Sequence, residues 1–462
     1  MKIGLEVHVQ LTTKTKLFCG CPNKFSNEPN IYVCDYCLGF PGSKPRINSR
    51  AFEYAMKIAL ALNCSVPDET FFSRKSYFYP DMGKNFQITQ FEMPVAKEGY
   101  VKISDHPLRK IRIRRIQMEE DPARLVHAGT ITKAEYVLAD YNRSGVPLCE
   151  IVTEPDIESS KEARIFLQEL SSILEYLGIY DPRIEGSMRV DSNISVGEVR
   201  VEIKNISGFK DVEKALNYEI IRQKNLLKRG VHVLMETRGW DADAGVTRSL
   251  RLKEGEEEYG YIFEPDLPRL TISQELIENI KDSLPEFAHE KVARYEKLGI
   301  ETNLAVSITS EPDLAEIFEK VVNNINPKLA ASWFAGEIKK TLNYNNLRIK
   351  ETGLTAEHLT KLLKMIENKE LTERSAELLL REMVVRPVDP EFAAKKSRRI
   401  YDEKVIDEVI EEIVAENTKA IIDYKAGKKE SFNFLVGQVM RKTQGRGDPD
   451  TIRKVLKRKL GG

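Results

Sequence analysis

The sequence predicts an α+β protein in which a mostly antiparallel sheet precedes a helical part of the chain. One observation is the alternation of apolar and polar residues at positions 3–10, which is typical of a half-buried strand and recurs in short segments before about residue 285. The other is the spacing of apolar residues by three to four positions beyond residue 287, which is typical of amphipathic helices. The sheet and most helices therefore belong to different parts of the chain.

The same two patterns predict the individual elements. Further strands are expected at residues 111–116, 188–196 and 199–206. Helices are expected at residues 49–62, 161–177 and 210–228, and then at 311–323, 330–343 and 355–368. Pro265 and Pro268 mark an irregular segment after which strand character ends. We therefore expect three domains, at residues 1–286, 287–400 and 401–462, the last a small helical tail.

Charge is balanced over the whole chain but not along it. Lys and Arg number 71, as do Asp and Glu, which excludes a uniformly basic coat. Residues 401–424 nevertheless carry a net charge of −6, and residues 425–462 one of +8. The basic run from Lys425 to Lys459 fits either an ordinary solvated face or a contact with an RNA backbone.

Nothing in the sequence predicts a membrane segment. The longest apolar stretches, such as Ile58–Leu62, are far shorter than the roughly 20 residues of a membrane span. Residues 1–6 lack the apolar core of a signal peptide. We therefore expect a soluble, cytoplasmic protein.

Four of the six cysteines lie close together in two pairs. Cys19 and Cys21 form a C-x-C pair, and Cys34 and Cys37 form a C-x-x-C pair twelve residues later. Disulfide frameworks belong to small secreted domains, whereas two close pairs of thiolates match a tetrahedral zinc site. Such a closed site would stabilise a loop and perform no chemistry. Reduced cysteines without a metal are the alternative.

Two acidic features could hold a divalent cation. Glu6 and His8 lie two residues apart in the first expected strand, so they project from the same face, although an ordinary solvated strand face is the more common explanation. Three consecutive acids at Glu119–Asp121 are costly unless a cation or donors compensate them, and hard divalent ions prefer oxygen ligands. A charged surface turn explains that run equally well.

Polar residues also alternate along two expected strands. Residues 189–193 and 200–204 place Arg, Asp, Asn, Glu and Lys on strand faces, which suits a nucleotide or phosphate site as well as the more common salt-bridged surface. No G-x-x-x-x-G-K-[ST] loop and no strand-linked G-x-G-x-x-G occurs. Any ATP site is therefore neither a P-loop nor a Rossmann site.

Ten short motifs, in this order along the chain, resemble those of one family. They are Gly4–Leu11, Cys37–Gly42, Arg74–Asp81, Gln87–Gln90, Met118–Asp121, Arg189–Asn193, Glu202–Asn205, Glu236–Arg238, Glu264–Pro268 and Phe434–Met440. The family is that of the B subunits of the aspartyl/glutamyl-tRNA(Asn/Gln) amidotransferases. No single motif is decisive, but their number and order make the resemblance specific.

The resemblance implies a cradle-shaped catalytic domain, a helical domain and a tail that binds tRNA. It implies a carbon–nitrogen ligase with glutamine as amido donor, in which the B subunit uses ATP to phosphorylate the side-chain carboxylate of Glu-tRNA(Gln), Asp-tRNA(Asn) or both. Ammonia then displaces the phosphate. The implied partners are the A subunit, which is an amidase and frees the ammonia, the small C subunit, and the misacylated tRNA.

The resemblance also implies a site. By position, magnesium is expected at Glu6, His8, Glu120 and Glu150. Because histidine is an unusual magnesium ligand, His8 would act through water or favour manganese. Lys75, Arg189 and Lys204 are expected to contact phosphate, and Tyr79, Asp191, Glu202 and Asn205 to shape the nucleotide pocket.

A second function stays open at this point. The chain could be a non-catalytic tRNA-binding adaptor of such a complex, with the basic tail as its working part and the sheet as a scaffold. The ordered acidic motifs in the expected sheet favour the enzyme.

Overall fold

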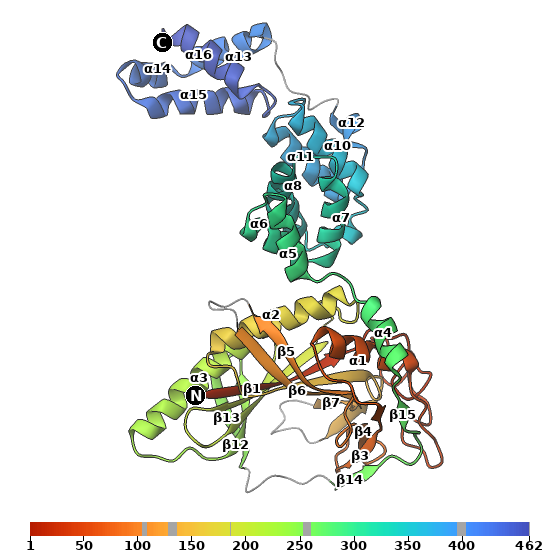
Figure 1. The fold of residues 1–462 in the computed structure, drawn as a ribbon. Coiled ribbons are helices and arrows are strands. Elements are labelled where there is room, and N and C mark those ends of the chain that lie inside the picture. Colours follow the sequence, from red (N-terminus) through yellow and green to blue (C-terminus); the bar gives the residue numbers. More distant parts are fainter. Residues whose placement is uncertain (104–108, 128–135, 185, 253–259, 395–402, 462) are drawn as a thin grey trace. The chain divides into compact units, whose positions relative to one another are not determined.

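A computed structural model describes the chain except residues 104–108, 128–135, 185, 253–259, 395–402 and 462 (Figure 1). Two compact units result, Met1–Glu286 and Phe287–Gly462. Within the described residues all strands belong to the first unit and the second is helical, so the predicted α+β class is confirmed. The expected boundary near residue 400 lies outside the described residues, and the three-domain division stays a prediction.

An eight-stranded sheet forms the centre of the first unit, in the order β13-β12-β11-β10-β1-β9-β6-β5. All neighbours pair antiparallel except β11 and β12, which are parallel. The strands are β1 (Lys2–Gln10), β5 (Ala96–Ile103), β6 (Arg109–Glu120), β9 (Pro147–Thr153), β10 (Met188–Ser195), β11 (Val201–Ile206), β12 (Glu236–Asp241) and β13 (Val246–Leu252). The first strand of the chain therefore lies inside the sheet.

Three small sheets complete the strands. They consist of β14 (Gly260–Phe263), β3 (Ser73–Ser76) and β4 (Phe86–Thr89); of β15 (Leu270–Thr271) and β2 (Glu69–Thr70); and of β7 (Arg124–His127) and β8 (Val137–Asp140). β4 contacts β6, which places the three-stranded sheet beside the large one.

Helices cover one face of the large sheet and leave the other polar. α1 (Ser49–Ala61), α2 (Ser160–Tyr176) and α3 (Phe209–Lys228) pack on it, and α4 (Gln274–Asp282) packs on α1 (Figure 1). In β1 the apolar residues Ile3, Leu5, Val7 and Val9 are buried in this core, because successive side chains of a strand point to opposite faces. The intervening polar residues face the uncovered side.

Helix ends follow the capping rules. Asn48 accepts hydrogen bonds from the backbone N–H groups of Arg50 and Ala51 and so begins α1. Ser159 begins α2 by accepting from the backbone N–H of Glu162. These caps satisfy donors that a helix leaves unpaired at its first turn.

The second unit contains only helices among its described residues. They are α5 (Ala288–Lys297), α6 (Thr302–Thr309), α7 (Pro312–Val322), α8 (Pro327–Trp333), a π-helical turn (Phe334–Ile338), α9 (Lys339–Tyr344), a 3₁₀ turn (Ile349–Glu351), α10 (Ala356–Glu367), α11 (Glu373–Val385), α12 (Pro390–Ala393), α13 (Glu403–Glu416), α14 (Thr418–Lys425), α15 (Lys429–Lys442) and α16 (Pro449–Leu460). One hydrophobic core joins residues of α5–α12 and another those of α13–α16. Across the described chain, no helix combines the length and apolar character that crossing a membrane requires.

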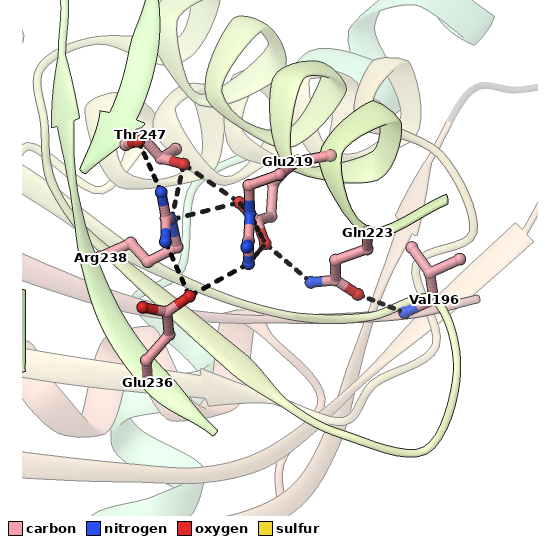
Figure 2. A network of polar contacts seen from close by, with 7 residues as sticks. Val196, Glu219, Gln223, Glu236, Arg238 and Thr247 are labelled. Atoms are coloured by element: carbon pink, nitrogen blue, oxygen red, sulfur yellow. Dashed lines mark hydrogen bonds and ion pairs between the residues drawn. The ribbon is translucent and has the colours of Figure 1, made fainter. Parts of the chain in front are cut away.

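A buried network of charges fastens α3 to the edge of the large sheet (Figure 2). Glu219 is fully buried, and its carboxylate pairs with Arg222 at 2.6 Å and Arg238 at 3.6 Å. It also accepts hydrogen bonds from Gln223 and from the hydroxyl of Thr247. A buried carboxylate with this many partners is compensated. If Glu219 were removed, Arg222 and Arg238 would have to share the single carboxylate of Glu236.

We expect Glu219→Ala to lower the free energy of unfolding of the first unit by about 3 kcal/mol, because the change leaves buried guanidinium groups short of a partner. Urea unfolding followed by Trp240 fluorescence in a Trp333→Phe background would report this unit alone, since the chain has only these 2 tryptophans. As a control, Lys214→Ala breaks an exposed pair with Asp211 and should change stability by less than about 1 kcal/mol. Equal effects of the two substitutions would contradict the expectation.

Candidate active site

A hollow of about 430 Å³ lies on the uncovered face of the large sheet. We call it the central hollow. Its lining includes eight of the sequence-predicted site residues, namely Glu6, His8, Lys75, Glu150, Arg189, Asp191, Lys204 and Asn205. Three further predicted residues, Tyr79, Glu120 and Glu202, are not part of the lining.

Strand register explains why residues so distant in the sequence meet here. In the antiparallel pairing of β1, His8 lies opposite Glu150 of β9 and Arg189 of β10, and Glu6 lies opposite Asp191. Directly opposite residues share a face of the sheet, with their Cβ atoms about 5 Å apart. The first strand therefore collects acidic and basic side chains from both neighbours.

One group of possible cation ligands consists of His8, Glu119 and Glu150. One ligand atom from each lies within 4.8 Å of the others, and His8 Nε2 is 3.4 Å from Glu119 Oε1. Burial and, second, the neighbouring Glu150 raise the pKa of Glu119 to about 7. Gln117 donates a hydrogen bond of 2.5 Å to Glu150 and fixes that carboxylate. A divalent cation would relieve the repulsion between the two acids, so the donor set fits such an ion.

A second group consists of Glu6, Asp191 and Glu202, again with ligand atoms within 4.8 Å. Burial and the surrounding carboxylates raise the pKa of Glu6. Lys204 Nζ lies 2.8 Å from Asp191 and 3.2 Å from Glu202. Burial lowers the pKa of Lys204, but these carboxylates outweigh it and raise that pKa overall, so the ammonium stays charged. Three acids therefore share one lysine.

Neutral side chains hold the second group in place. Asn193 donates to Glu6 Oε1 at 3.1 Å, and Thr237 donates to Glu202 Oε2 at 2.9 Å. The sequence alone had indicated no role for Thr237. Glu202 also lies in a strand with a bulge, where Asn205 adopts a φ of 62°.

The structure does not bring Glu120 together with the other predicted metal ligands. The Glu120 carboxylate lies on the other side of β6, 2.5 Å from Lys84 Nζ, and accepts from the backbone N–H of Ile88 and the hydroxyl of Tyr36. Glu119 takes the expected place beside His8. The physical reason is strand alternation, because neighbouring residues of β6 point to opposite faces.

The sequence carried a signal for Glu119. Ile116 and Met118 are apolar and buried, which puts Glu119 on the polar face. Earlier in the strand the apolar positions are Ile111 and Ile113, and a bulge between Ile113 and Arg115 changes the parity. Extending the alternation from the start of the strand would therefore place Glu120, rather than Glu119, on the polar face.

The basic residues of the central hollow come from different elements. Lys75 lines it from β3 of the small sheet. Arg189 pairs with the buried Asp121 at 2.8 Å; burial lowers the pKa of Arg189, but this pairing outweighs it and raises that pKa overall. Tyr79, by contrast, is 54% exposed outside the hollow.

The four clustered cysteines of the sequence also cluster in space. Cys19, Cys21 and Cys34 have their Sγ atoms 3.5–3.8 Å from that of Cys37. A tetrahedron with zinc–sulfur bonds of about 2.3 Å has edges of about 3.8 Å, so the four thiols fit zinc. The hydrogen bond from Cys19 and, next among the lowering effects, the Lys16 ammonium lower the pKa of Cys37 to about 4.

Lys16 links this cluster to the turn beside the central hollow. Its side chain is fully buried, and Nζ lies 3.4 Å from Cys37 Sγ. It also donates to the backbone carbonyls of Tyr32 and Tyr141, at 2.8 and 3.2 Å. The cysteine loop and the 141–146 turn are thus held by one buried cation.

Family models and individual proteins similar to this chain agree on one family. The family described as "GatB/GatE catalytic domain" matches residues 1–278, and that described as "GatB domain" matches residues 316–460. The chain is 42% identical to the B subunit of the aspartyl/glutamyl-tRNA(Asn/Gln) amidotransferase of Carboxydothermus hydrogenoformans, over 99% of this chain and 98% of that protein. Proteins of the same name from Methanoregula boonei and Thermotoga maritima are 45% and 42% identical, over 98% and 100% of this chain and 97% and 98% of theirs.

Glu119→Gln should weaken the binding of Mn²⁺ at least tenfold, because it removes a negative ligand from the group with His8 and Glu150. Electron paramagnetic resonance of free Mn²⁺ during a titration would measure this. Glu120→Gln is the matched comparison and should leave Mn²⁺ affinity within about twofold, since its carboxylate faces Lys84. The reverse order of effects would restore Glu120 to the metal set.

Cys37→Ser should abolish stoichiometric zinc, because Cys37 contacts all three other thiols of the cluster. Elemental analysis of the purified protein would measure the zinc, and the melting temperature should fall with it. Cys149→Ser changes a buried cysteine outside the cluster and should leave the zinc content unchanged. Wild-type protein without zinc would remove the metal assignment.

Proposed function

Because this chain belongs to the family of aspartyl/glutamyl-tRNA(Asn/Gln) amidotransferase B subunits, we propose that it phosphorylates and then amidates the side-chain carboxylate of Glu-tRNA(Gln), Asp-tRNA(Asn) or both. The observation that carries the proposal is the central hollow, where two acidic groups lie beside Lys75, Arg189 and Lys204. Such a site can bind a divalent cation and phosphate together.

The chemistry explains why ATP is needed. A carboxylate reacts poorly with ammonia, because an oxide would have to leave. Transfer of the γ-phosphoryl group to a carboxylate oxygen gives an acyl phosphate and ADP. Ammonia then attacks the acyl carbon, the bond to the phosphate oxygen breaks, and the nitrogen loses a proton to give the amide.

The protein's share in this reaction is positioning and charge neutralisation, since phosphoryl transfer needs little covalent help. We assign Lys75 and Arg189 to the phosphate oxygens. Lys204 holds the second acidic group together through Asp191 and Glu202. Magnesium, or manganese beside the imidazole, would be held by His8, Glu119 and Glu150 and by the second group, and would supply charge neutralisation between the phosphates.

The ammonia would come from another protein. We propose that an amidase, the A subunit of the assembly, releases it from glutamine and that a small C subunit joins the two, which makes the assembly a carbon–nitrogen ligase. It would act in the cytoplasm, where charged tRNA is used. Zinc in the cysteine cluster would be structural, because four protein ligands leave no open position.

The decisive experiment is an assay of the co-expressed assembly on both misacylated tRNAs, with ammonium chloride as an alternative nitrogen source. We expect ADP release that depends on misacylated tRNA, and a decrease of more than 100-fold in its kcat for His8→Ala with unchanged tRNA affinity. Asp211→Asn, a change on α3 outside both acidic groups, should retain full activity. Binding of tRNA without ADP release on either substrate would favour the non-catalytic adaptor instead.

The tail is the part that we propose to contact the tRNA backbone, but its basic side chains are not equivalent. Lys454 and Arg458 of α16 pair with Glu403 of α13, and Lys459 pairs with Glu411. The acidic stretch at residues 401–424 therefore neutralises part of the basic run. Among the described side chains of α15 and α16, three exposed basic residues make no ion pair with a described acidic residue, namely Arg441, Arg453 and Lys457.

Arg453→Ala with Lys457→Ala should raise the apparent KM for tRNA and reduce the slope of log affinity against log salt by about 1 per lost phosphate contact. Filter binding at several salt concentrations would measure the slope. The matched double variant Lys454→Ala with Arg458→Ala removes the same charge but also leaves Glu403 without these two partners. It should weaken tRNA binding too, with a smaller decrease in the salt slope. An unchanged slope in the first variant would exclude these residues from the contact.

A further inference from the structure

A buried polar cluster joins the cysteine loop, residues 19–37, to the end of β6. It consists of Tyr36 of that loop, Lys84 and Glu120, and we call it the bridging cluster. The Tyr36 hydroxyl donates to Glu120 Oε2 at 3.3 Å and accepts from Lys84 Nζ at 3.0 Å. Lys84 Nζ also lies 2.5 Å from Glu120 Oε1 and 4.4 Å from the centre of the Tyr36 ring. The three side chains therefore fix one another's positions.

Glu120 in turn holds β4. Its Oε1 atom accepts from the backbone N–H of Ile88 at 2.9 Å, and its backbone carbonyl accepts from the side-chain amide of Gln87 at 2.8 Å. Hydrogen bonds from residues 117 and 118 to residues 89 and 90 also join these segments. Glu120 therefore sets the exact position of β4 on β6 and is not the sole support of the contact.

β4 passes this position on to Lys75. In the antiparallel pairing of β3 and β4, Lys75 lies directly opposite Gln87, and both side chains line the central hollow. Glu119, one of the possible cation ligands, belongs to β6. A shift of β4 on β6 would therefore change the distance between Lys75 and the cation ligands. A misplacement of about 1 Å between reacting groups can lower a rate strongly.

The cysteine cluster determines where Tyr36 lies. Cys37 follows it directly and Cys34 precedes it by two positions, so two of the four clustered thiols flank it. Its ring packs edge-on against Phe18, with ring centres 6.3 Å apart, and the residue is buried. Zinc–thiolate bonds have defined lengths and a tetrahedral arrangement, so zinc at the four thiols would fix the backbone on both sides of Tyr36.

We propose that Tyr36 is a positioning residue that couples zinc in the cysteine loop to the central hollow, because its hydroxyl holds Glu120 and β4 then places Lys75. This role rests on the proposed function, in which Lys75 contacts phosphate. Tyr36 acts through Glu120 and not on the substrate. Loss of its hydroxyl leaves the ion pair between Lys84 and Glu120 in place, so the expected result is a folded protein with a displaced Lys75.

Tyr36→Phe in the assembled complex tests the effect on the reaction. It removes the hydroxyl and keeps the ring, so the zinc content should not change and the KM for misacylated tRNA should stay within twofold of wild type. The kcat of tRNA-dependent ADP release should fall at least threefold. In a Glu120→Gln background the same change should have a smaller effect, because the hydroxyl acts through that carboxylate. Tyr32→Phe is the control in the same loop, since the Tyr32 hydroxyl makes no hydrogen bond with a described residue.

Hydrogen–deuterium exchange of the assembled complex measures the coupling without turnover. Segment 86–90 contains the Ile88 amide that donates to Glu120, and its exchange should be at least fivefold faster in Tyr36→Phe. Removal of zinc from the wild-type complex by a chelator should accelerate this exchange similarly. Removal of zinc from Tyr36→Phe should add less than twofold. The exchange of β9 should stay at the wild-type rate in every case, which distinguishes the coupling from general destabilisation.

These measurements separate the role of Tyr36 from the proposed function. If the wild-type complex released no ADP, the proposed function would fail, while the exchange of segment 86–90 still tested the link from Tyr36 to β4. Four results would each overturn the proposal. They are unchanged exchange in Tyr36→Phe, a kcat within twofold of wild type, equal effects of zinc removal with and without the hydroxyl, and loss of zinc from Tyr36→Phe.

Discussion

The pairing of β1 with β9 on one side and β10 on the other is the constraint on which the site depends. It fixes Glu6, His8, Glu150 and Asp191 on one face at a spacing that no single segment could supply. The other face of β1 is apolar and covered by helices, so a slip of one residue would bury the acids and expose the core. Fold stability and site geometry are therefore specified by the same register.

Bringing so many acids together is unfavourable in the absence of a ligand. The pKa values of Glu6 and Glu119 are both raised, because burial and neighbouring carboxylates oppose their ionisation. Neutral hydrogen-bond donors and a single lysine reduce the repulsion between these carboxylates, in place of one cationic partner for each acid. Asn193 and Thr237 orient carboxylates without cancelling their charge. The negative potential is thereby kept available for a cation, which is the purpose a preorganised polar site serves.

The sequence predicted the strands and clusters that depend on local periodicity and spacing. The alternation around Glu6 and His8 identified β1, and the spacing of the cysteines identified their cluster. Features that depend on long-range pairing were missed. The bulge in β6 shows in the sequence only as a shift of the apolar positions from Ile111 and Ile113 to Ile116 and Met118. Thr237 meets Glu202 only because β11 and β12 pair in parallel. The resemblance pointed to Glu120, whereas the structure brings Glu119 to His8 and Glu150.

The position of β1 in the sheet also has a consequence for the synthesis of the chain. β1 is translated before its partners β9 and β10, which end at Thr153 and Ser195. At about 5 to 20 residues per second, the edge that pairs with β9 stays without its partner for roughly 7 to 29 seconds on the ribosome, and the edge that pairs with β10 for roughly 9 to 37 seconds. Contacts between segments so far apart also form slowly. The strand at the centre of the site is thus open to mispairing at both edges while the protein is being made. Its polar side chains, at every second position, keep it from being a continuous apolar edge.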